Sequence, residues 1–162
     1  MVVQLKKHNF HSQHSKSERS AATIQEILRR EFEKQKTEIK TQYDQALDVG
    51  HFDEAERIIS TQRAIENRVR HIINPRLSTI AIIDGINCEI MGDADFLILE
   101  DEGYVARNLT LSKHGLDRDA GSTNYSYIRL QLFGWLLWKL TKVVPAGLEL
   151  QNKDGELTSI RF

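Results

Sequence analysis

The sequence predicts an α/β fold, close to α+β, in which helices flank a mixed central sheet. Three observations predict it. The first half repeats apolar residues at helical spacing, residues 77–112 carry β-branched runs separated by glycine turns, and an apolar segment at 125–141 precedes a closing hairpin. We expect one domain over residues 17–162, which is long enough to bury a sizeable core.

Residues 1–16 are polar and rich in Lys, His and Ser, so we expect a flexible arm there. Ser17 or Ser20 can cap a long helix that runs to about Asp48. Its basic residues form one edge, which can either track phosphates or remain solvated among glutamates. Its apolar residues lie on one face: Ile24, Leu28, Phe32, Ile39, Tyr43 and Leu47.

A second helix is expected from about Asp53 to Ile73, with a buried stripe of Ala, Ile and Val residues. Gly50 is suited to ending the first helix, and the Gly50-His51 corner predicts that residues 17–74 form a helical hairpin. Asn74-Pro75 ends the helical half, because proline disfavours a helical residue before it.

Residues 77–162 are expected to form the sheet core. Turns at Asp84-Gly85 and at 101–103 divide residues 77–112 into a three-part antiparallel meander. Residues 114–124 are expected to be a loop. The segment 125–141 has few polar positions, so it predicts a helix buried on most sides. After Pro145, the chain predicts a β-hairpin about Asp154-Gly155.

Composition excludes several classes of protein. The 162 residues are 40% hydrophobic and 28% charged with a net charge of -1, which argues against coating nucleic acid by charge alone. The sequence has no run of 18 apolar residues, so no membrane span is expected, and the N-terminus has no secretory signal core. Cys88 is the single cysteine, so no internal disulfide and no four-cysteine iron–sulfur cluster is expected. We therefore expect a cytoplasmic or virion-interior protein.

Four polar residues on the predicted meander have the spacing of a metal site. Asp93 and Asp95 stand two apart, as do Asn108 and Thr110 on the next predicted strand. Side chains two apart share one face of a strand, and neighbouring strands lie about 4.8 Å apart, so these groups can converge. Metal-assisted hydrolysis uses two or three carboxylates on Mg²⁺ or Mn²⁺. Two aspartates at a strand start are equally compatible with ordinary turn and solvent-facing residues.

This region resembles the PD-(D/E)XK nuclease superfamily, in the branch of RecB-type nuclease domains and CRISPR-adaptation exonucleases. The stretch Gly92-Asp-Ala-Asp95 matches the Gly-x-x-Asp of that branch, and Gln131-Leu-Phe-Gly-Trp135 matches its Gln-x-x-x-Tyr with Trp for Tyr. The resemblance covers about residues 77–162. It implies a restriction-endonuclease-like core, DNA as the substrate, and roles in the site for Asp95 and Gln131.

The departures from the family pattern indicate a degenerate site. Where the family has Asp/Glu-x-Lys, this chain has Asn108-Leu109-Thr110, so one carboxylate and the lysine are missing. Lys113 and Asp93 are the residues that can replace them. The family also uses a glutamate from its first core helix. The candidates here are Glu26, Glu31, Glu33 and Glu66.

Three functions remain open. The first is a nuclease-like domain that does not cut and instead binds DNA or a protein partner, or has a structural role. The second is an active Mg²⁺- or Mn²⁺-dependent DNA nuclease with relocated residues. The third is a helical assembly subunit, with homo-oligomerisation possible, whose nuclease likeness is incidental. None of the three involves a membrane.

Overall fold

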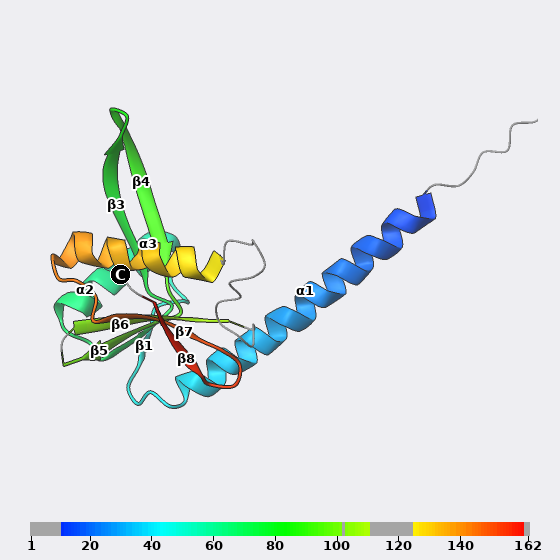
Figure 1. Cartoon of the computed structure of the whole chain (residues 1–162), viewed down its shortest axis with the longest axis horizontal. Helices are drawn as coiled ribbons and strands as arrows, with labels where there is room; N and C mark the ends of the chain where they lie inside the picture. Colours follow the sequence, from blue (N-terminus) through cyan, green and yellow to red (C-terminus); the bar gives the residue numbers. More distant parts are fainter. Residues whose placement is uncertain (1–10, 102, 111–124, 161–162) are drawn as a thin grey trace, which may run out of the picture.

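The computed structural model describes residues 11–101, 103–110 and 125–160. A mixed six-stranded sheet forms the body, a two-stranded arm rises from it, and a long helix extends from its other side (Figure 1). The described elements are α1 (His11–Lys40), β1 (Leu47–Asp48), α2 (Glu54–Glu66), β2 (His71–Ile73), β3 (Arg76–Ile83), β4 (Ile86–Asp93), β5 (Phe96–Glu100), β6 (Gly103–Leu109), α3 (Tyr125–Thr141), β7 (Gly147–Gln151) and β8 (Leu157–Ile160).

The sheet has the order β1-β2-β5-β6-β7-β8, and it confirms the predicted α/β class with a mixed sheet. β1 and β2 are parallel, β5 is antiparallel to both β2 and β6, and β6 and β7 are parallel. Helix α3 makes the crossover that a parallel β6–β7 pair requires. The predicted C-terminal hairpin is confirmed, because β8 pairs antiparallel with β7.

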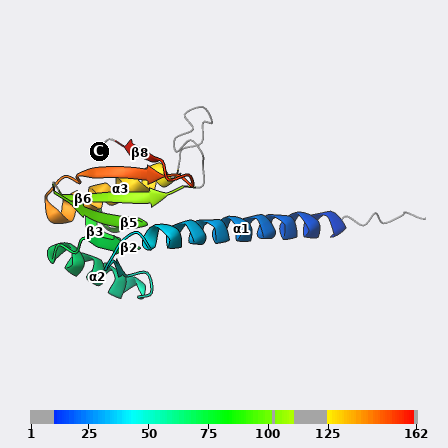
Figure 2. The same ribbon diagram turned by 90° about the horizontal axis from the view of Figure 1, so that it is seen from below.

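Helices lie on both faces of the sheet (Figure 2). One core, which includes Leu97, Phe133 and Leu148, lies under α3 and α2. A second core, which includes Ile39, Phe96 and Leu109, lies under the C-terminal part of α1. No helix among the described residues is long and apolar enough to cross a membrane.

The predicted first helix is wrong at both ends. It already runs from His11, within the expected flexible arm, and it ends at Lys40 rather than near Asp48. Residues 1–10 of that arm lie outside the described residues. After Lys40 the chain turns through Gln45, which has φ 56, and Leu47–Asp48 then join the sheet beside β2. Backbone pairing with β2 outweighs the helical spacing of Tyr43 and Leu47.

The predicted helical hairpin does not form, because the last residues expected in each of its two helices are in strands β1 and β2 instead. Helix α2 ends at Glu66, and residues 71–73, which were expected to be its last turn, form strand β2. Two backbone bonds close α2: Arg68 N–H donates to the Ile65 carbonyl, and Val69 N–H donates to the Ala64 carbonyl. This is a Schellman ending with Arg68 at φ 51, where a glycine usually stands.

The predicted meander is divided between two sheets. β3 and β4 pair only with each other and form the arm, whereas β5 and β6 belong to the body. The chain changes sheet at Ala94, whose N–H donates to the Pro75 carbonyl. The predicted strand 86–100 is therefore broken into β4 and β5. The predicted helix at 125–141 is confirmed, but only one side of it is buried: Ile128 and Trp138 are exposed.

Gly92 lies where β4 passes close to α3. A Cβ built on it would be 2.9 Å from Cδ1 of Leu136, which is fully buried. We expect Gly92→Ala to lower the free energy of unfolding by about 1–3 kcal/mol, because an overpacked core must shift. Urea denaturation measures the change. Gly147→Ala is the control, since its Cβ would meet Val105 at 3.5 Å, an ordinary contact. Equal effects of the two variants would contradict this explanation.

Candidate functional site under the first helix

Asp95 occupies the point where β5 and β6 begin to separate. The last paired residues there are Phe96 and Arg107. Beyond this pair, the side chain of Asp95 replaces a backbone partner of β6: its Oδ2 accepts a hydrogen bond of 2.8 Å from the Leu109 N–H. Its backbone carbonyl accepts from the Asn74 N–H of the β2 side. Asp95 is therefore buried, at 6% exposure, and tied to both neighbouring strands.

Asn108, on the neighbouring strand β6, forms a hydrogen bond with the backbone of Asp95. Its Oδ1 accepts a hydrogen bond of 2.9 Å from the Asp95 N–H, and the residue is 1% exposed. The Asp95 side chain thus binds the backbone beside Asn108, and the Asn108 side chain binds the backbone of Asp95. The sequence predicted this adjacency from the spacing of the two residues on neighbouring strands. An amide suits this role because it accepts a hydrogen bond without adding a second buried charge.

The cation at this site comes from α1. Lys36 Nζ lies 2.9 Å from Asp95 Oδ1, and the two side chains are 14% and 8% exposed. Lys36 stands one turn after Phe32 and one turn before Ile39, which both pack on the sheet. Its ammonium also lies 5.8 Å from the centre of the Phe32 ring. Packing of the apolar face of α1 therefore places this lysine directly over Asp95.

Buried amide side chains lie on the helix that carries Lys36 and at the end of the neighbouring strand β7. Gln35 Nε2 donates to the Asn152 carbonyl at 2.8 Å, and Gln35, Gln151 and Asn152 are all buried. Asn108 Nδ2, Gln35 Oε1 and Gln151 Oε1 are buried without a hydrogen-bond partner among the described residues. These groups make the site polar, yet they add no negative charge to that of Asp95.

A second ionic contact fixes the end of α1 to the sheet. Arg107 of β6 donates to Glu149 Oε2 of β7 at 2.7 and 2.9 Å and to the Tyr43 hydroxyl at 2.8 Å. Burial raises the pKa of Tyr43, so its hydroxyl stays protonated. Tyr43 also stacks on His71 with ring centres 4.5 Å apart. These contacts hold the segment after α1, and with it Lys36, in one position.

Asp93 does not belong to this site. It is the last residue of β4, in the arm, whereas Asp95 precedes β5 in the body, so the prediction that they share one strand face is wrong. Asp93 Oδ2 accepts from Arg129 of α3 at 2.7 Å, and its Oδ1 lies 4.0 Å from Arg76. The change of sheet at Ala94 directs the two carboxylates to cations on different elements.

The other candidates have separate surroundings. Thr110 follows β6 and donates its N–H to the Gln151 carbonyl, whereas Lys113 lies outside the described residues. Gln131 Nε2 donates to the Tyr127 hydroxyl one turn earlier on α3. Within the described part of the chain, Gln131 forms no hydrogen bond with Asp95 or Asn108.

None of the four glutamate candidates belongs to a metal-holding group with Asp95 among the described residues. Glu26 binds Arg29 and Arg30 on the surface of α1, and these hydrogen bonds lower its pKa. Glu31 lines a surface hollow of α1, Glu33 gives its backbone carbonyl to Thr37, and Glu66 lies at the end of α2. The side chain of α1 that reaches the site is a lysine.

The residues present do not suit a divalent metal ion. Mg²⁺ and Mn²⁺ favour several charged oxygen ligands. Here one carboxylate has both oxygens engaged, by Lys36 and by the Leu109 N–H, and the neighbouring acceptor is a neutral amide. Within the described residues, no group of three or more His, Cys, Asp or Glu side chains is placed to hold a metal.

Comparisons with known proteins give little further guidance. No family model matches the chain, and no curated protein matches it. Seven chains of solved structures match. One is the crystal structure of SSO0001, with 12% identity, a TM-score of 0.37, and coverage of 83% of this chain and 76% of that one. Likeness at this level is too weak to indicate a shared fold or function.

Proposed function

We propose that this chain is a nuclease-like domain that does not cut nucleic acid and acts as a protein-interaction module. The observation that carries the proposal is the buried ion pair between Lys36 and Asp95, 2.9 Å long. The ammonium group balances the charge of Asp95, as a metal ion would in an active nuclease of the family that this sequence resembles.

The charge at the site supports this proposal. Asp95 contributes one negative charge, Lys36 one positive charge, and Asn108 none, so the formal sum is zero (-1 + 1 + 0). A metal-dependent nuclease needs two or three carboxylates around its cation. A divalent ion here would have to displace the ammonium and would then meet a single charged ligand.

Exposed apolar side chains support the interaction role. Ile27 and Leu28 of α1 are 54% and 48% exposed, on a helix that extends well beyond the sheet (Figure 1). The arm and the outer side of α3 add further isoleucines, Trp138 and Tyr125. Scattered apolar residues are normal on a surface, but contiguous ones mark interaction sites.

The basic residues of α1 favour DNA binding less. Arg29 and Arg30 both bind Glu26, and Lys40 binds Asp48 at 2.7 Å. A phosphate backbone would have to compete with these carboxylates. Only a surface with many uncommitted Lys and Arg side chains gives strong, salt-dependent binding.

A nuclease assay tests the proposed function. We expect the purified chain to leave single- and double-stranded DNA and RNA intact in Mg²⁺ or Mn²⁺, with the same background as Asp95→Ala. Fluorescence polarisation with labelled DNA is expected to show no tight binding at 150 mM salt. Metal-dependent cleavage that disappears in Asp95→Ala would overturn the proposal in favour of an active nuclease. Tight DNA binding without cleavage would favour a nucleic-acid-binding module.

A further inference from the structure

The arm formed by β3 and β4 exposes a run of isoleucines. Ile80, Ile82, Ile83 and Ile86 are 69%, 74%, 50% and 66% exposed. Figure 1 shows that the arm rises away from the body, with no other described element beside its outer half. Two-stranded hairpins are marginally stable in water, and exposed strand edges invite pairing. An arm of this kind is therefore expected to be covered by another surface.

One face of the arm has no charged residue. Directly opposite pairs in the ladder are Thr79 with Ile90, Ala81 with Cys88, and Ile83 with Ile86. Paired residues point to the same side of a sheet, so these six form a continuous uncharged face that includes the exposed Ile83 and Ile86. Ile80 and Ile82 lie on the other face, opposite Glu89 and Asn87. Between Ser78 and Met91 the arm carries two acidic residues, Asp84 at the turn and Glu89, and no Lys or Arg. A partner of the arm should thus offer apolar side chains and a cation near the tip.

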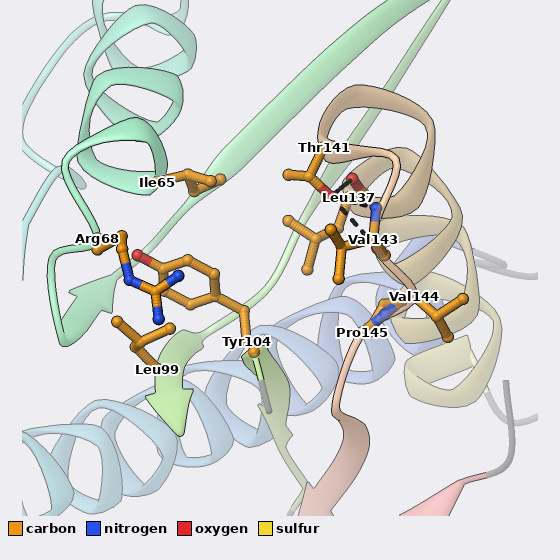
Figure 3. A pocket seen from close by; sticks show the side chains of 10 residues that line it. Ile65, Arg68, Leu99, Tyr104, Leu137, Thr141, Val143, Val144 and Pro145 are labelled. Carbon is orange, nitrogen blue, oxygen red and sulfur yellow. Dashed lines mark hydrogen bonds between the residues drawn. The ribbon is translucent and has the colours of Figure 1, made fainter. Parts of the chain in front are cut away.

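The chain itself has such a surface next to the base of the arm. An apolar pocket of about 160 Å³ lies between the end of α2 and the end of α3, lined by residues that include Ile65, Leu99 and Val143 (Figure 3). A neighbouring hollow shares Ile65 and adds Leu77 from the base of the arm and Leu140 from α3, and it is also lined by Glu66. The pocket and the hollow together are called the base groove below.

Arg68 supplies the cation of the base groove. It lines both the pocket and the hollow, and Figure 3 shows its side chain at one wall of the pocket. Its guanidinium forms no ion pair or hydrogen bond with any described residue. The carboxylate of Asp84 at the tip of the arm is likewise unpaired within the described part of the chain. The tip of the arm and the pocket beside its base therefore carry opposite charges, Asp84 at the tip and Arg68 in the pocket, whereas Glu66 lines only the neighbouring hollow.

We propose that two copies of this chain associate through their arms, with each tip in the base groove of the other copy. The proposal deepens the proposed function, on which it rests, by naming the partner of the interaction module. From Leu77 to Ile83 the arm spans about 20 Å at ~3.3 Å per residue. Two arms side by side in opposite directions bring each tip to the base of the other, which is where the groove lies. This arrangement is closed and two-fold symmetric.

Charge reversal at the two ends tests the association. Sedimentation velocity and light scattering are expected to show a dimer of the full chain at micromolar concentration. Asp84→Lys and Arg68→Glu should each weaken the dimer at least about tenfold, and the combined variant should restore much of it. Asp154→Lys controls for the added charge, because Asp154 is exposed in the chain's other Asp-Gly turn, although Asp84 alone of the two has a positive φ, of 49. Circular dichroism establishes that each variant is folded.

Replacing exposed isoleucines of the arm with serine provides a second test of the dimer that does not depend on charge. Ile83→Ser with Ile86→Ser should give a folded monomer, since this pair lies on the uncharged face and both side chains are exposed in the isolated chain. A wild-type chain that stays monomeric at about 100 µM, where a dimer of micromolar Kd would be mostly assembled, or a dimer unaffected by these variants, would overturn the proposal. A monomer that leaves DNA intact refutes only the arm exchange, whereas a dimer that cuts DNA refutes only the proposed function.

Discussion

Lys36→Met is expected to lower the free energy of unfolding by about 3–5 kcal/mol, the cost typical of breaking a buried ion pair. The lysine is 14% exposed and its partner Asp95 is 8% exposed, so water can screen the orphaned carboxylate only weakly. Methionine keeps most of the aliphatic volume that packs near Phe32, which limits the loss to that of the charge. Urea denaturation followed by circular dichroism measures the change.

Lys40→Met is the matched control for this prediction. Lys40 is one turn further along α1 and binds Asp48, but the two side chains are 46% and 30% exposed. Exposed pairs contribute about 0–1 kcal/mol, so the control should lose little. Asp95→Asn and the double variant with Lys36→Met complete a cycle that isolates the coupling between the two side chains. A coupling near zero would contradict the structural role given to this pair.

The second large effect is expected when the charge of the site is inverted. Lys36→Met together with Asn108→Asp replaces a formal charge of zero with two adjacent buried carboxylates (-1 - 1 = -2). Without metal, repulsion and burial should destabilise this variant strongly. With millimolar Mn²⁺ or Mg²⁺, binding to the folded state should restore stability according to the metal concentration.

Thermal unfolding with and without metal measures this rescue. We expect Mn²⁺ to raise the melting temperature of the double variant by several degrees and to leave the wild-type chain unchanged. Asn108→Asp alone keeps Lys36 and should respond less. If the wild-type chain responded to Mn²⁺ as strongly as the double variant, the site would already be suited to a metal. If neither responded, Asp95 and position 108 would not share one cavity.

The sequence predicted those parts of the fold whose signals are local. Alternating apolar runs, the Asp-Gly turns and Pro75 indicated a helical region followed by a sheet, a late apolar helix and a closing hairpin. The end of α2 was not predictable in this way, because Arg68 takes the left-handed conformation that glycine usually marks. β1 and β2 are short, and their pairing depends on residues distant in sequence.

The candidate site was predictable in part. The spacing of Asp95 and Asn108 indicated neighbouring positions on paired strands, and they are joined by hydrogen bonds. The partner of Asp95 was missed, because Lys36 belongs to a helix 59 residues away in sequence. One signal was present: Lys36 interrupts the apolar stripe of Phe32 and Ile39, where a charged side chain needs a buried partner. The separation of Asp93 from Asp95 depends on the change of sheet, which alternation alone does not reveal.

A crystal structure of the wild-type chain soaked in Mn²⁺, with anomalous data collected, tests the central claim most directly. We expect no anomalous peak beside Asp95 and a lysine ammonium at hydrogen-bond distance from its Oδ1, as in the 2.9 Å contact described above. A manganese ion bound to the Asp95 carboxylate, with Lys36 turned away from it, would contradict the claim and point to a working nuclease.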